Sequence, residues 1–303
     1  MILARIALAV VLLWVSGSSA ATATPTRFPS PEAALAALVQ AVRASDSAAL
    51  LGVLGPDARA LISSGDEVAD RQSRERFIRA YDEAHRLAEV RPGRLVLTVG
   101  PDEWPMPIPL VQDASGWWFD TSQGREEILN RRIGRNELNA VQVCLAYVDA
   151  QREYYVRDPD GDALLQYAQR FRSAPGKRDG LYWNTQPDEP PSPLGLLVAR
   201  AEAEGYPVKR PAGPRIPYWG YYYRIVKAQG AHAPGGAYDY VVRGHMIGGF
   251  ALVAYPAEYG ASGVMTFLVN HDGVVYQKDL GPSTTTTARA LTRFDPDSSW
   301  SRF

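Results

Sequence analysis

The side chains of this chain that could perform acid–base chemistry gather in its last third. His232, His245 and His271 lie there together with Asp239 and Asp272. An imidazole beside a carboxylate is the usual pair for general acid–base catalysis, and the same groups bind metals. Their separations match no compact zinc-binding pattern, and the sequence favours ordinary polar residues in turns. The alternative is a hydrolase that uses His245 or His271 with a nearby acid such as Asp239.

Three alternating aspartates form a second candidate site. Asp158, Asp160 and Asp162 in RDPDGDA resemble the oxygen ligands of a calcium-binding loop. An EF-hand that began at Asp158 would need glycine at its sixth position and an acid at its twelfth, where this chain has Ala163 and Gln169. A solvated turn that caps a following helix explains the same acids, so calcium is the less favoured interpretation. We expect no other cofactor.

Adjacent aromatic residues are a third candidate. Residues 117–118 are Trp-Trp, and residues 219–223 read Trp-Gly-Tyr-Tyr-Tyr. Neighbouring side chains of a strand point to opposite faces, so one ring of each set could be exposed and stack on sugar rings or peptides. Trp118, Trp219 and Tyr222 are the candidates for such stacking. Packing of the rings on both faces is the alternative, and the pattern favours it.

No complete catalytic set accompanies these residues. The chain has no Gly-x-Ser-x-Gly elbow and no phosphate-binding glycine loop. Its 32 Lys and Arg residues nearly balance its 33 Asp and Glu residues, which argues against a nucleic acid partner. We therefore predict a non-catalytic binding or scaffolding protein whose partner is another protein or a glycan.

The first 20 residues predict export. They combine Arg5, an apolar run over residues 6–15 and small residues up to Ala20, as secretory signal peptides do. The apolar run is shorter than the roughly 18 to 20 residues that span a bilayer, which favours cleavage over anchoring. With Cys144 as the only cysteine, no internal disulfide forms. We expect a periplasmic or secreted envelope protein, without stable membrane insertion after leader cleavage.

Four predicted strands in the C-terminal half would position these residues. They cover residues 221–227, 250–255, 264–269 and 274–280, which are rich in β-branched and aromatic side chains. Residues 270–273, Asn-His-Asp-Gly, predict a hairpin turn between the last two strands. Both alternating sets of residues 250–255 are apolar, so this strand should be covered on both faces.

An amphipathic helix over residues 136–155 is the predicted cover of that sheet. Leu145 lies on its apolar stripe and Gln142 on its polar side. We expect Leu145 to be buried against the sheet. Cys144, beside the stripe, is interpreted as a small buried apolar residue rather than a reactive thiol.

The N-terminal half predicts helices followed by strands. Ser30 can cap a first helix, and a longer helix covers residues 67–87. Strands are expected at residues 94–99, 106–111 and 117–119. The fold class is therefore α+β, with a helical layer on a small antiparallel sheet, then a long helix packed on a C-terminal antiparallel sheet.

These elements divide the chain into successive parts. They are a signal peptide at 1–20, a spacer at 21–29, an N-terminal α+β domain at 30–133, a C-terminal helix-and-sheet domain at 134–282 with a loop-rich insertion at 156–217, and an extended arm at 283–303.

Four longer stretches follow one another in a characteristic order: FPSPEAALAAL, GWWFDTSQG, ELNAVQVCLAYVDAQREYY and GGFALVAYPAEYGASGVMTFLVNHDGVVYQKDLG. In this order the chain resembles the bacterial domain-of-unknown-function (DUF) family 2950. The likeness covers nearly all of the chain after the leader and implies an exported protein, without implying an activity. The long helix, loop-rich insertion and antiparallel sheet also look like the globular heads of type IV pilins and pseudopilins, which implies a pilin-like C-terminal half.

Overall fold

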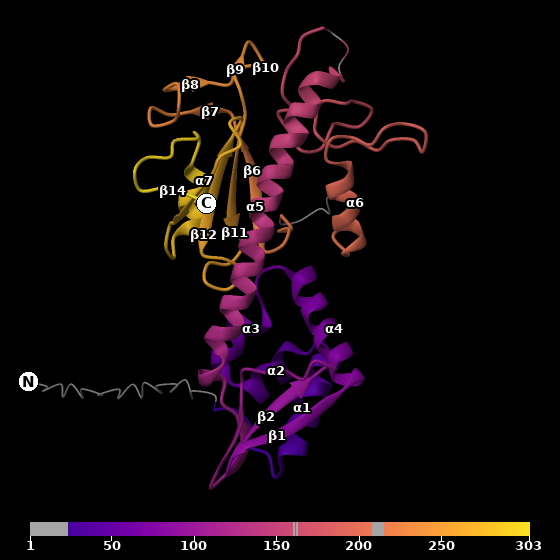
Figure 1. Ribbon diagram of the computed structural model, residues 1–303, viewed down its shortest axis with the longest axis vertical. Helices are drawn as coiled ribbons and strands as arrows, with labels where there is room; N and C mark the ends of the chain where they lie inside the picture. Colours follow the sequence, from indigo (N-terminus) through magenta and orange to yellow (C-terminus); the bar gives the residue numbers. More distant parts are fainter. Residues whose placement is uncertain (1–23, 160, 162, 208–214) are drawn as a thin grey trace, which may run out of the picture.

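A single long helix, α5 (Arg125–Arg157), connects an N-terminal and a C-terminal part of the protein (Figure 1). The computed structural model describes residues 24–159, 161, 163–207 and 215–303. With 33 residues, α5 is about 50 Å long at 1.5 Å per residue. The predicted helix is correct, but it starts at Arg125 rather than at residue 136. Gly124 precedes it, and Glu126 and Glu127 favour the positive end of the helix dipole.

The N-terminal part is a helical layer on an antiparallel sheet, as the sequence predicts. Its helices are α1 (Pro31–Arg43), α2 (Ser47–Leu54), α3 (Arg59–Ile62) and α4 (Glu67–Glu83), with the short 3-10 turns η1 (Pro56–Ala58) and η2 (Thr121–Gln123). Its strands are β1 (His85–Arg91), β2 (Arg94–Val99), β4 (Leu110–Asp113) and β5 (Gly116–Phe119) in that order, with β3 (Trp104–Pro105) beside β2. Ser30 caps α1 by accepting a hydrogen bond from the Ala33 N–H at 3.2 Å.

Strand β1 corrects the prediction of a helix over residues 67–87. α4 ends at Glu83, and the following residues pair with β2 along nearly their whole length. Gly93 has φ 71°, which suits the tight turn between the two strands. Pairing across this turn outweighs the helix propensity of the sequence before it, since tertiary contacts commonly override local preference.

The C-terminal part is built on a five-stranded antiparallel sheet. Its order is β14 (Ser301–Arg302), β13 (Val275–Asp279), β12 (Met265–Asn270), β11 (Ala251–Pro256) and β6 (Tyr221–Val226). β12 and β13 form the predicted hairpin, with Gly273 at φ 79° in the turn. Every residue of β11 is buried, which confirms the strand with two covered faces. Helix α5 contacts β11 on one side, and helix α7 (Thr284–Ala290) also contacts it.

The segment at 283–303 is not the expected extended arm. It forms α7, and it ends in the edge strand β14. Ala288 and Phe294 are fully buried. The Arg224 guanidinium donates to the carbonyl oxygens of Ala288 and Leu291 at the C-terminal end of α7, where backbone carbonyls lack partners in a following turn. A run of four threonines concealed this helix in the sequence, because packing rather than propensity stabilises it.

The face of α5 that covers the sheet differs from the predicted one. Leu145 is 37 % exposed, so the prediction that it is buried is wrong. Two polar residues belong to the buried stripe instead. The Asn136 amide donates to the Ser262 carbonyl at 2.9 Å, and the Gln151 amide both donates to and accepts from the backbone of Ala168 at 2.8 Å. Because these amides find partners, burial does not penalise them.

The insertion after α5 packs on the sheet and contributes one helix, α6 (Gly195–Ala203). Leu181 is fully buried, and the Tyr154 hydroxyl donates to the Arg178 carbonyl at 3.0 Å. After β6, four short strands form two hairpin pairs: β7 (Ala228–Gln229), β8 (Tyr238–Asp239), β9 (Val241–Val242) and β10 (His245–Met246). Within the described ranges, no helix has the length and apolar character needed to cross a membrane.

Candidate ligand-binding site

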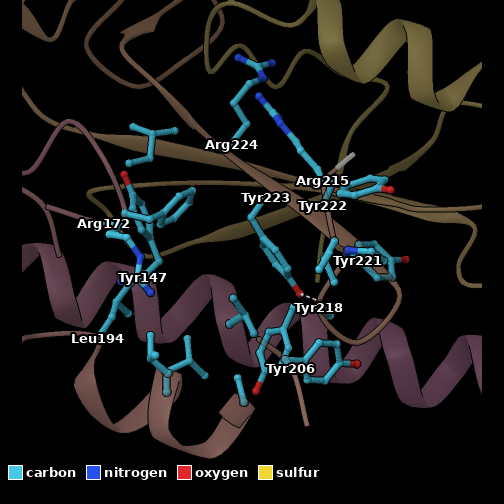
Figure 2. Close-up of a pocket in the computed structure, with 18 of the residues that line it drawn as sticks. Tyr147, Arg172, Leu194, Tyr206, Arg215, Tyr218, Tyr221, Tyr222, Tyr223 and Arg224 are labelled. Carbon is cyan, nitrogen blue, oxygen red and sulfur yellow. Dashed lines mark hydrogen bonds between the residues drawn. The ribbon is translucent and has the colours of Figure 1, made fainter. Parts of the chain in front are cut away.

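A pocket of about 610 Å³ lies between α5, α6 and β6 (Figure 2). Helix α5 contributes Val143 and Tyr147, and α6 contributes an apolar wall. All five residues from position 221 to 225 of β6 line it, together with segments 169–172 and 215–218. Both alternating sets of β6 side chains are therefore present, so the pocket wraps around the edge of this strand.

Tyrosines form one side of the pocket. Figure 2 shows the Tyr223 side chain extending from β6 towards α5, with its hydroxyl donating to the Tyr218 carbonyl at 3.3 Å. The rings of Tyr206 and Tyr218 meet edge to face at 4.9 Å. Burial is the main cause that raises the pKa of all three phenols. They therefore stay neutral near neutral pH and offer hydroxyl donors and ring faces.

Among the residues that the structure describes, four arginines line the pocket, and no aspartate or glutamate does. Arg170 pairs with Asp179 at 3.4 Å, and the Arg172 guanidinium lies over the Tyr182 ring at 4.8 Å. Arg215 is exposed, and Figure 2 shows its end beside that of Arg224.

The proximity of these two guanidinium groups affects Arg224. Burial first, and then the positive charge of Arg215, lower the pKa of Arg224 from its ordinary value, whereas Tyr255 opposes this shift. An arginine remains charged even so, because its ordinary pKa is far above neutral. Two positive charges on one wall favour the binding of an anion between them.

A buried carboxylate fastens this pocket to the N-terminal part. Asp66 precedes α4 and accepts a hydrogen bond from the Ala69 N–H at 3.0 Å. It also accepts from the Tyr206 hydroxyl at 2.9 Å and from the Gly220 N–H at 2.8 Å. Burial, as the largest effect, raises the pKa of Asp66. One side chain of the N-terminal part thus holds both a tyrosine of the pocket and the turn that leads into β6.

Gly220 allows this close approach. Its φ is 75°, and a Cβ added there would lie 2.7 Å from the Asn136 amide nitrogen and 3.0 Å from the Ser262 side chain. Only glycine fits such a position without displacement of its neighbours. The sequence showed Gly220 between aromatic residues, but it gave no indication that Asp66 would meet it.

The predicted acid–base residues lie outside this pocket. The His245 ring nitrogen Nδ1 is 3.2 Å from the Gln166 side-chain oxygen, and Asp239 pairs with Arg293 at 3.2 Å. The His271 ring meets the Tyr240 ring edge to face, and its Nε2 is 3.9 Å from Asp272. The structure thus gives Asp239 an arginine partner, and it gives neither His245 nor His271 a carboxylate within hydrogen-bond distance.

The third histidine of the set does meet an acid. His232 lies 3.0 Å from Asp295, with the histidine side chain 59 % exposed. His232 lies in the loop before β8 and Asp295 lies after α7, and neither residue lines the pocket. An exposed pair of this kind agrees with the interpretation as ordinary polar residues.

Of the three predicted stacking residues, one reaches the pocket. Tyr222 lines it and is half-buried. Trp219 is only 8 % exposed, because it stacks on Tyr218 at 4.5 Å and has the Arg200 guanidinium over its ring at 4.5 Å. This ring is packed rather than exposed, which is the alternative that the sequence pattern favours. Trp118 lies in β5 beneath the Arg27 guanidinium, at 4.3 Å.

The calcium prediction remains a prediction. Asp160 and Asp162 lie outside the described residues. Asp158 ends α5 at φ 42°, and its side chain accepts a hydrogen bond from the Ala163 N–H at 3.1 Å. Within the part of the chain that the structure describes, no three His, Cys, Asp or Glu side chains gather as metal ligands would.

Cys144 agrees with its interpretation as a buried apolar residue. It is fully buried on the sheet-facing side of α5, and burial raises the pKa of its thiol to about 12. A thiol with such a pKa is protonated at neutral pH, and it is not a nucleophile there.

Comparison with known proteins places the chain in one family. The family described as "Protein of unknown function (DUF2950)" matches residues 25–303. No curated protein and no solved structure matches the chain. The likeness to pilin heads therefore stays a prediction, although the long helix packed on an antiparallel sheet is present.

Proposed function

Because the chain belongs to the DUF2950 family of proteins of unknown function, we propose its function from its own geometry. It is a non-catalytic binding protein of the bacterial cell envelope, and it holds an organic anion in the pocket beside β6. The predicted leader at residues 1–20 supports export, and it lies outside the described residues.

The observation that carries this proposal is the charge of the pocket lining. The described lining of the pocket has four arginines and no carboxylate. Guanidinium groups bind carboxylate, phosphate and sulfonate groups through paired, charge-assisted hydrogen bonds. Tyrosine rings and the apolar wall of α6 suit the uncharged, flat portion of a ligand. The volume of about 610 Å³ lies within the range of small-molecule pockets.

The chemistry of the same lining supports binding over catalysis. The described part of the lining contains no His, Asp, Glu, Cys, Lys, Ser or Thr. General acid–base catalysis requires a group that titrates near neutral pH, and nucleophilic catalysis requires an activated hydroxyl, thiol, amine or carboxylate. Protonated arginines and neutral, buried phenols can hold and orient an anion. The His245 and His271 hydrolase has no comparable support, since neither residue lines this pocket.

The proposal is tested with two fluorescent dyes that share an anilinonaphthalene ring system, of which only one carries a negatively charged sulfonate group. We expect 8-anilinonaphthalene-1-sulfonate to bind with a saturable rise in fluorescence, whereas 1-anilinonaphthalene, which lacks the sulfonate, binds at least tenfold more weakly. Arg215→Gln should weaken sulfonate binding about tenfold, since one charge-assisted hydrogen bond is worth about 1.5–3 kcal/mol. Arg302→Gln, in β14 at the opposite edge of the sheet, is the matched control and should change it less than twofold.

Two results would overturn the proposal. One is equal affinity for the charged and the neutral dye. The other is sulfonate binding that Arg215→Gln leaves unchanged. A rise in the dissociation constant with added salt is also expected, because the attraction between an exposed guanidinium and an anion is screened.

A further inference from the structure

The strand that lines the pocket has an open edge. β6 is the last strand in its sheet, and among the described residues β11 is the only strand that pairs with it. Tyr218 covers the beginning of the outer edge through two backbone hydrogen bonds with Tyr221, at 2.9 and 3.2 Å. Beyond Tyr221, the outer edge of β6 borders the pocket.

The hydrogen-bond pattern identifies which backbone groups face outwards. The Ala257 N–H donates to the Gly220 carbonyl at 2.8 Å. Hydrogen-bonded pairs of an antiparallel ladder recur at every second residue, so Tyr222 and Arg224 direct their backbone groups towards β11. Tyr223 and Ile225 therefore direct theirs away from the sheet. No residue that the structure describes forms a hydrogen bond with the N–H or C=O groups of these two residues.

A second stretch of backbone lines the other side of the opening. Residues 169–172 line the pocket in sequence, as residues 221–225 do. Two backbone hydrogen bonds fix this segment in place. The Leu181 N–H donates to the Arg170 carbonyl at 3.2 Å, and the Tyr182 N–H donates to the Phe171 carbonyl at 2.7 Å. The pocket is thus bordered by two stretches of main chain. The stretch in β6 has N–H and C=O groups that no described residue pairs with.

The two faces of β6 differ in chemistry. Arg224 lies on the α7 side, where the charge of Arg215 acts on it. Tyr223 lies on the other side, where Val143 of α5 and Leu197 of α6 belong to the same apolar cluster. A strand placed beside β6 would direct every second side chain to each face. Acidic side chains suit the arginine face, and apolar side chains suit the α6 face.

We propose that the pocket receives an extended segment of another protein, in which acidic and apolar residues alternate, as an added strand beside β6. The proposal rests on the anion-binding function above and names its ligand class. Added strands gain affinity from main-chain hydrogen bonds and specificity from alternate side chains. The segment satisfies the backbone groups of Tyr223 and Ile225, and its carboxylates neutralise Arg215 and Arg224.

The test uses a labelled peptide, acetyl-Glu-Val-Glu-Val-Glu-Val-amide, in fluorescence anisotropy with the full mature chain. We expect saturable binding, and at least tenfold weaker binding for the peptide with Lys in place of Glu. Two further peptides carry N-methyl groups on all valines or on all glutamates. At least one of them should bind tenfold more weakly, the valine set if the strand adds antiparallel and the glutamate set if it adds parallel.

Amide hydrogen exchange gives the second readout. Saturation with the peptide should slow exchange at Tyr223 and Ile225 at least tenfold, whereas Tyr222 and Arg224, already paired with β11, should change less. Strand addition is refuted if neither methylated peptide loses tenfold in affinity, or if exchange at Tyr223 and Ile225 is unchanged. In that case, sulfonate dye binding that still depends on Arg215 leaves the anion-binding function standing. If sulfonate dye binding does not depend on Arg215 either, both strand addition and the anion-binding function are refuted.

Discussion

Replacement of Asp66 by alanine tests whether one buried carboxylate joins the two parts of the molecule. Asp66 is fully buried and accepts three hydrogen bonds: from the Ala69 N–H, the Tyr206 hydroxyl and the Gly220 N–H. The first bond caps α4. The other two reach the pocket wall, more than a hundred residues away in the sequence.

The expected cost follows from these three contacts. Loss of a helix cap costs about 1 kcal/mol. Leaving a buried donor without an acceptor costs about 1–3 kcal/mol, and two such donors remain after the substitution. Removal of a carboxylate that burial already penalises offsets part of the loss. We therefore expect Asp66→Ala to lower the free energy of unfolding by about 2–5 kcal/mol.

Urea denaturation followed by tryptophan fluorescence and circular dichroism measures this loss. Asp46→Ala is the matched control, because the exposed Asp46 side chain also caps a helix, α2, through the Ala48 and Ala49 N–H groups, and it forms no other hydrogen bond with a described residue. It should cost about 1 kcal/mol. Equal losses for the two variants would show that the Tyr206 and Gly220 contacts contribute nothing, and the reasoning would fail. Asp66→Ala should also weaken sulfonate dye binding, since Tyr206 loses its support.

Three further predictions concern single side chains. Leu252→Ala, at a fully buried position of β11, should lower the free energy of unfolding in urea by about 2–5 kcal/mol, whereas Leu145→Ala, at a position 37 % exposed, should lower it by less than about 1.5 kcal/mol. Similar losses for the two variants would contradict the observed face of α5. The Cys144 thiol, with its pKa raised to about 12, should resist Ellman's reagent at pH 8 in the folded protein and react after unfolding in urea; rapid reaction of the folded protein would contradict its burial. Burial raises the pKa of Asp66, so the folded protein binds a proton at this carboxyl group more tightly than the unfolded protein does. Protonation of Asp66 therefore contributes fully to stability below pH 3.8, and this contribution is lost as the pH rises through the raised pKa. The difference in unfolding free energy between the native protein and Asp66→Asn should therefore fall as pH rises above 3.8, and a difference independent of pH between 3 and 7 would refute this.

The sequence predicts the fold class and most of the strands because these depend on local patterns. The hairpin at residues 270–273 is one example, since Gly273 supplies the positive φ and the flanking strands are apolar. The sequence did not predict which face of α5 packs on the sheet, because Asn136 and Gln151 are polar and such residues usually face solvent. Both are buried, and their amides form hydrogen bonds with backbone carbonyls. Helix α7 was hidden for a similar reason, since its stability comes from packing on β11.

The candidate site was largely beyond sequence analysis. Its arginines at 170, 172, 215 and 224 are spread over three segments with no recognisable spacing. Tyr222 was the one predicted residue that proved to line the pocket. The histidines were candidates because of their versatile chemistry, but His232 lies in a loop, His271 in a hairpin turn and His245 in the short strand β10, all outside the pocket. The contact between Asp66 and Gly220 spans 154 positions, and no local rule reveals such a pair.

Helix α5 affects how this chain can be divided. Its first turns pack on the N-terminal part, where Ile128 contacts the core and Arg132 donates to the carbonyl oxygens of Ala60 and Leu61. Its later turns contribute the centre of the second core. The predicted boundary at residues 133–134 falls inside this helix, and a cut there would expose apolar surface on both sides. Neither half can therefore be exchanged on its own with a segment of another gene. A gene rearrangement that preserves the fold has to include the N-terminal part, α5 and the C-terminal part together.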